Sequence, residues 1–72
     1  MRRPGYWLNQ LDPGDPVVEV NGNDRRASGP GTVLSVSPET VKVQDQHGGT
    51  RQYQLCDGHC IENPVWYITR PQ

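Results

Sequence analysis

The stretch GTVLSVSPETVKVQDQHGGTRQYQL, residues 31–55, alternates apolar and polar side chains in three short runs. In the middle run, Val41 and Val43 fall on one face of a strand and Lys42 falls on the other. The tetrapeptide SPET has proline at the second position of a β-turn, and HGG supplies the glycines that suit a tight hairpin. The stretch therefore predicts three strands joined by tight turns, at residues 31–37, 40–46 and 50–55.

Two further strands are expected outside this stretch. Residues 15–20 follow the turn DPGD, and Pro16 suits the first position or the edge of a strand. The last strand is expected at residues 64–70, PVWYITR, which are bounded by prolines. Between the first two strands, NGNDRRASGPG at residues 21–31 is expected to be a polar loop of about ten residues, longer than an ordinary hairpin connection.

The chain of 72 residues suffices for one domain with a small core. Near its start, Trp7 and Leu11 are spaced for one face of a short helical turn, with prolines suited to the beginning and the end of that turn. An extended arm is the alternative. We therefore expect an arm or short helical turn at residues 1–13 and a barrel at residues 14–70.

Five short strands cannot bury both faces of an open sheet, whereas a curled barrel buries one face and removes most edges. The strand order and loop lengths resemble those of the SH3-like small barrels, including the KOW and Tudor groups. The residues that carry the resemblance are Gly14, Asp15 and Val17, followed by GTVLSV, VKVQDQHGG and the closing VWYI. The resemblance implies an all-β, five-stranded SH3-like barrel with one short helical turn, CDGHC, before the last strand.

The charge balance favours a protein partner over nucleic acid. Seven Lys and Arg stand against eight Asp and Glu, a net charge of -1, whereas generic capture of phosphate needs a basic excess. A local basic patch stays open as an alternative. No apolar run approaches the roughly 20 residues that span a bilayer, and the N-terminus lacks the apolar part of a signal peptide. We therefore expect a cytoplasmic protein, away from membranes, with reduced cysteines.

The segment CDGHC contains both cysteines and one of the two histidines of the chain. Cys56 and Cys60 would share one face of a helical turn, which gives a weak alternative of a zinc site from Cys56, Cys60, His47 and His59. Structural zinc normally uses two cysteine or histidine pairs at short spacing, and only one such pair exists here. A disulfide disagrees with the expected compartment, and a nucleophilic cysteine lacks a third group to orient its base.

The favoured interpretation of CDGHC is a tight turn. Gly58 permits the turn, Asp57 accepts a backbone N–H, and one cysteine fills the end of the barrel. No metal and no other cofactor is expected.

Aromatic and arginine side chains provide the candidate binding surface. Trp66 and Tyr67 lie on opposite faces of the last strand, and the sequence leaves open which ring faces the core. Tyrosine and tryptophan suit recognition, and an adjacent arginine can pair with phosphates or acidic groups. The alternative for Trp7 is that it covers an open barrel end. The candidate binding residues are Arg2, Arg3, Tyr6, Trp7, Arg25, Arg26, Trp66, Tyr67 and Arg70.

The stretch PETVKVQDQHGGTRQYQL is similar to the corresponding part of the plasmid-encoded type II dihydrofolate reductases, which are SH3-like barrels active as tetramers. Their Val-Gln-Ile-Tyr pore motif falls on residues 51–54, where only Gln52 matches. The resemblance implies a shared fold and gives an oligomeric reductase-like enzyme as one alternative. No carboxylate pair, glycine-rich phosphate loop or Ser-His-Asp spacing indicates another reaction.

These patterns favour a small non-enzymatic binding or regulatory module. We interpret this module first as a protein–protein adaptor or an inhibitor of a larger machine. The alternative interpretation is a nucleic-acid-binding barrel. A free-standing barrel of this size resembles the accessory proteins that bacteria, plasmids and phages encode. The sequence does not indicate an oligomeric state.

Overall fold

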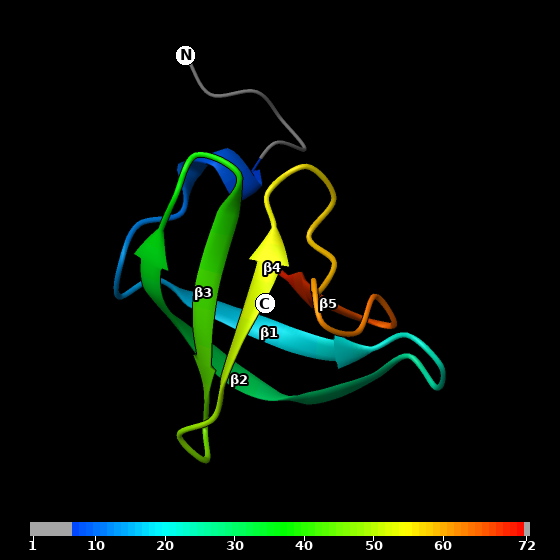
Figure 1. Ribbon diagram of the computed structural model, residues 1–72. Coiled ribbons are helices and arrows are strands. Elements are labelled where there is room, and N and C mark those ends of the chain that lie inside the picture. Colours follow the sequence, from blue (N-terminus) through cyan, green and yellow to red (C-terminus); the bar gives the residue numbers. More distant parts are fainter. Residues whose placement is uncertain (1–6, 72) are drawn as a thin grey trace.

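The computed structural model describes residues 7–71, and its five strands form one antiparallel sheet that curls into a half-barrel (Figure 1). The strands follow the order β4-β3-β2-β1-β5 across the sheet. The expected all-β class with five strands is confirmed. The elements are the 3₁₀ helix η1 (Trp7–Gln10) and the strands β1 (Pro16–Asn21), β2 (Arg26–Val36), β3 (Thr40–Asp45), β4 (Thr50–Gln54) and β5 (Trp66–Thr69).

The long strand β2 joins the two halves of the sheet. Its first half pairs with β1 and its second half pairs with β3. The register shifts once in each pairing, which leaves Ser28 and Leu34 without a direct partner. Such bulges bend a strand and increase its twist. In Figure 1 the hairpin end of β1 and β2 therefore runs across the direction of β3 and β4.

The connection between β1 and β2 is much shorter than expected. The polar loop predicted at residues 21–31 is wrong, because the chain turns within residues 22–25 and β2 begins at Arg26. Side chains fix this turn from both ends: the backbone N–H of Asn23 donates to Asn21 Oδ1 (2.9 Å), and that of Arg26 donates to Asp24 Oδ1 (3.1 Å). The residues that resemble a loop in sequence therefore belong to a turn and a bulged strand.

The turn expected before the last strand is present as one isolated turn that is not part of a helix. The N–H of Gly58 donates to the carbonyl oxygen of Gln54 (2.7 Å), one i→i+4 bond that no following residue continues into a helix. Gly58 has φ +78°, a left-handed conformation that glycine adopts readily. Asp57 Oδ1 accepts the N–H of His59 (2.9 Å), as the sequence indicated.

The residues after this turn link the two outer strands of the sheet. Cys60 forms a bridge with Tyr53 of β4, and His59 forms one with Tyr67 of β5. On the β4 side the N–H of Gln54 donates to the carbonyl oxygen of His59 (2.9 Å). On the β5 side the N–H of Cys60 donates to the carbonyl oxygen of Trp66 (2.8 Å). The edge strands of the sheet are β4 and β5. Part of the free edge of each strand thereby forms hydrogen bonds with the residues that follow the turn.

The core lies on the inner face of the curl. In β5, Ile68 is buried and Trp66 packs against the core, so Tyr67 lies on the outer face. Trp7 and Leu8 of η1 also pack against this core. The described residues contain no helix of the length and apolar character that crossing a bilayer requires. The core residues are Leu11, Val17, Val33, Val41, Val43, Tyr53, Cys60 and Ile68.

Candidate functional site

A buried carboxylate lies inside the half-barrel. Glu19 is on the same face of β1 as Val17, and it is only 2% exposed. Its Oε2 atom accepts hydrogen bonds from the Tyr53 hydroxyl and from Arg51 Nη1, the latter at 3.3 Å. Burial raises the pKa of Tyr53, and the neighbouring Glu19 carboxylate raises that pKa further, so the phenol is a hydrogen-bond donor at neutral pH.

Arg51 extends this network to the end of the β3–β4 hairpin. Its Nη1 atom lies 3.0 Å from Asp45 Oδ2, and its guanidinium carbon lies 5.1 Å from the centre of the Trp66 ring. No buried side-chain nitrogen or oxygen lacks a hydrogen-bond partner in the part of the chain that the structure describes. The network therefore joins β1, β3, β4 and β5 from the inside and has no unpaired polar atom aimed at a ligand.

Sequence reasoning did not identify Glu19. The signal was its place two residues after Val17 in an alternating strand, which puts an acidic side chain on the inward face. Tyr53 and Arg51 have the same spacing in their own strand. An inward carboxylate facing an inward tyrosine and arginine is recognisable only once the strands are paired.

Three of the predicted binding residues come together on the outer face of the sheet. Arg25 from the β1–β2 turn, Tyr67 from β5 and Arg70 from just beyond β5 line one hollow of about 380 Å³. Val18 and Val20 supply its apolar part. We call Arg25, Tyr67 and Arg70 the arginine–tyrosine face. It combines two exposed cations with a half-buried ring, a combination that suits recognition of anionic groups.

A second hollow, of about 480 Å³, adjoins this face and shares Arg25 and Tyr67 with it. His59 lines it, with its ring centre 5.6 Å from that of Tyr67. Nδ1 of His59 donates to the carbonyl oxygen of Pro64 (2.7 Å), which fixes the orientation of the imidazole and leaves Nε2 on the other side of the ring.

The remaining predicted binding residues do not join the arginine–tyrosine face. Arg26 is exposed at the start of β2, and it lines neither of the two hollows. Trp66 faces inward against Arg51, and Trp7 packs on the core. The predicted residues Arg2, Arg3 and Tyr6 lie outside the described residues.

The two cysteines of the CDGHC segment lie in different environments. Cys56 is exposed, Cys60 is 2% exposed in the core, and both are free thiols. His47 is in the β3–β4 turn, at the opposite end of β4 from Cys56. Within residues 7–71 no three histidine, cysteine or acidic side chains lie close enough together to hold a metal ion. One buried cysteine at the end of the curl agrees with the favoured interpretation.

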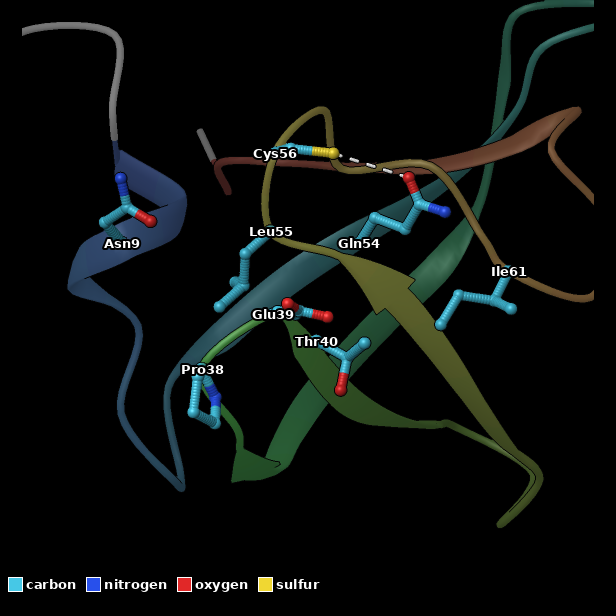
Figure 2. Close-up of a pocket in the computed structure, with 8 residues that line it drawn as sticks. All are labelled: Asn9, Pro38, Glu39, Thr40, Gln54, Leu55, Cys56 and Ile61. Atoms are coloured by element: carbon cyan, nitrogen blue, oxygen red, sulfur yellow. Dashed lines mark hydrogen bonds between the residues drawn. The ribbon is translucent and has the colours of Figure 1, made fainter.

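A third hollow, of about 650 Å³, lies between η1 and the end of β4 (Figure 2). Asn9 reaches it from one side and Ile61 from the other, and Leu55 lies between them. The Cys56 thiol points toward Gln54 Oε1 (3.4 Å) at its rim. Glu39 is the charged residue among those that line it. The groove is partly apolar, and Ile61 at its edge is 43% exposed.

The four positions aligned with the reductase pore motif divide between the two faces of β4. Arg51 and Tyr53 point inward and belong to the Glu19 network, whereas Gln52 and Gln54 are exposed. Comparisons of the chain with models of known protein families, with curated proteins and with solved structures find no match.

Proposed function

We propose that this protein is a small non-enzymatic binding module that regulates or adapts a larger protein through its arginine–tyrosine face. The observation that carries the proposal is the convergence of Arg25, Tyr67 and Arg70 on one hollow, although Arg25 is distant in sequence from the other two. A half-buried tyrosine with flanking arginines provides the side chains that are enriched at the centres of protein interfaces.

The strand arrangement supports an SH3-like barrel as the scaffold of this module. Five antiparallel strands, a bulged second strand and a bridging turn before the last strand agree with that topology. A non-enzymatic role is supported by the interior, where the polar side chains Glu19, Tyr53 and Arg51 are bonded to one another. Such a network stabilises a fold, and no buried polar side-chain atom among residues 7–71 is left unpaired to face a substrate.

Site-specific photo-crosslinking tests the proposal. Tyr67 is replaced by p-benzoylphenylalanine on the arginine–tyrosine face, and Lys42, exposed on β3, is replaced in the same way as a matched control. After irradiation in a lysate of the source organism, we expect one protein adduct from position 67 and none from position 42. Equal labelling at both positions, or no protein adduct from position 67, contradicts the proposal.

Nucleic-acid binding is the second candidate function. A ring between two arginines can also stack on a base while the arginines contact phosphates, and this arrangement is the specific observation in its favour. It predicts that a single-stranded oligonucleotide binds and that its affinity falls with salt. Absence of binding of a 12-nucleotide oligothymidylate at low salt removes this candidate.

A further inference from the structure

Two hollows lie next to each other at Tyr67. They share Arg25 and Tyr67 as a common wall, with Arg70 at one end and His59 at the other. A compact ion would occupy one hollow, whereas an extended segment can cross the tyrosine ring and occupy both. An extended segment is thus the ligand shape that would contact both hollows.

The cations of this surface are available to a ligand. In the described part of the chain, the ion pairs with a carboxylate are those of Arg51, and neither Arg25 nor Arg70 takes part in one. The nearest acidic residue in sequence, Asp24, uses its Oδ1 atom to accept the N–H of Arg26. Two exposed guanidinium groups beside one hollow favour a ligand with a carboxylate or another anion between them.

The backbone of Arg25 also distinguishes this residue. Its φ of +56° lies in the left-handed region, where it is the one non-glycine residue among those described. Glycine would adopt this conformation at lower cost, because a side chain at positive φ is crowded by its own backbone. An arginine at this position therefore costs stability, and backbone strain of this kind is concentrated at functional sites in proteins.

We infer that the partner of this module contributes an extended acidic segment that crosses Tyr67, with one carboxylate between Arg25 and Arg70. This inference rests on the proposed function and specifies the chemistry of the partner. His59, whose Nδ1 is engaged by Pro64, presents Nε2 to a polar group further along the same segment.

Charge complementarity favours an acidic peptide over nucleic acid at this face. Two arginines suit one or two carboxylates, whereas strong binding of nucleic acid relies on many phosphate contacts and a basic protein. The chain has a net charge of -1. The electrostatic attraction of the protein for an anionic ligand is thus confined to the arginine–tyrosine face.

The probe for this inference is a 12-residue peptide of alternating Glu and Ser, with the peptide of alternating Gln and Ser as its control. Titration is followed by the amide resonances of the ¹⁵N-labelled protein. We expect the Glu peptide to shift resonances around Arg25, Tyr67 and Arg70, and the Gln peptide to leave them unchanged. Equal shifts with both peptides, or none with either, overturn the inference.

Variants identify the side chains that bind the peptide. Arg25→Gly removes the cation and the unfavourable side chain at positive φ together, so the fold is retained while the affinity falls. We expect Arg25→Gly combined with Arg70→Gln to weaken binding of the Glu peptide about tenfold. Lys42→Gln and Arg26→Gln, each removing an exposed cation elsewhere, should change it less than about twofold. Equal losses in all variants would indicate nonspecific attraction and overturn the inference.

The outcome is separable from that of the proposed function. If position 67 crosslinks to a protein and mass spectrometry maps the adduct to a segment without Asp or Glu, the acidic-segment inference fails and the binding module stands. If position 67 gives no protein adduct, the binding module fails whatever the peptide does. Tighter binding of the 12-nucleotide oligothymidylate than of the Glu peptide assigns the face to nucleic acid and overturns the inference.

Discussion

At the scale of single residues, Glu19 is the charged residue buried in the interior among residues 7–71. A carboxylate that is 2% exposed is costly unless it is hydrogen-bonded and paired, and here Tyr53 and Arg51 supply both. The side chain of Arg51 remains 35% exposed, so water screens part of the ion pair. The network consequently gives geometric specificity to the packing of β1 against β4 as well as stability.

Replacement of Arg51 by Met leaves the Glu19 carboxylate without its counter-charge. We expect the free energy of unfolding to fall by about 2 kcal/mol, less than for a fully buried pair because Arg51 is partly exposed. In the double variant with Glu19→Gln the loss should be smaller than the sum of the two single losses. Urea denaturation measures all three, with Arg26→Met as an exposed control. Additive losses contradict an energetic coupling between the two residues.

Asp45 gives the hairpin a dependence on pH. The backbone N–H of His47 holds the pKa of Asp45 below its ordinary value of 3.8 against a partial loss of hydration, and Gly49 and Arg51 lower that pKa further. A lowered folded-state pKa means that the contribution is present above the unfolded-state pKa and is lost as pH falls through the folded-state pKa. We expect wild type to lose its stability advantage over Asp45→Asn below about pH 4. Urea denaturation between pH 7 and pH 2 checks this, and a constant difference contradicts it.

At the scale of elements, a strand was predicted well where the turns that bound it are clear in the sequence. Within residues 31–55, the end of β2 and the strands β3 and β4 were predicted because their turns, SPET and HGG, have unambiguous chemistry. The first part of β2 was missed because Gly29 and Pro30 resemble loop residues. Gly29, whose φ is +151°, lies beside a bulge. Pro30 lies in the part of β2 that pairs with β1, before the pairing of β2 with β3 starts. A glycine and a proline that serve a bulge cannot be distinguished locally from those of a loop.

Gly31 tests how closely β2 packs on the core. A Cβ atom at this position would lie 2.7 Å from Val43 Cγ1 and 3.4 Å from Val17 Cγ2. Gly31→Ala should therefore lower the free energy of unfolding by about 1–3 kcal/mol through overpacking. Ser35→Ala, an exposed change in the same strand, should stay within about 0.5 kcal/mol of wild type in the same thermal denaturation experiment. Equal melting temperatures for the two variants would contradict the close packing of Gly31.

At the scale of the whole molecule, the arginine–tyrosine face depends on a pairing of strands that could not be predicted from the sequence. Tyr67 and Arg70 were candidates from composition, yet their meeting with Arg25 required the β1–β2 turn to end beside β5. The choice between Trp66 and Tyr67 as the inward ring was open because a one-residue slip exchanges the two faces of a strand. The Glu19 network resolves that choice, since Arg51 stacks on Trp66 from inside.

Residues 58–61 form a bridge between β4 and β5. This bridge predicts that backbone amides all around the sheet are protected from hydrogen exchange to a similar degree. The amides of Gln54, Cys60 and Ile68 donate across it to carbonyl oxygens at 2.9, 2.8 and 3.0 Å. We expect their hydrogen exchange, followed by NMR, to be slowed to a degree comparable with the amides of β1 and β2. The amide of Asp24, in the exposed β1–β2 turn, serves as the fast-exchanging reference. Rapid exchange at Cys60 and Ile68 alone would mean that the outer strands open independently.

The pairing of β1 with β5 also bears on how the protein is made. Val18 of β1 pairs with Thr69 of β5, so β1 is synthesised well before the strand that completes its pairing. While the later residues are still inside the ribosome, the growing chain can form the hairpins of β1 to β4 but cannot complete the sheet. Contacts between distant parts of a sequence also slow folding. The sheet is therefore expected to close only once β5 has left the ribosome, and a ribosome stalled before codon 66 would hold an incomplete sheet.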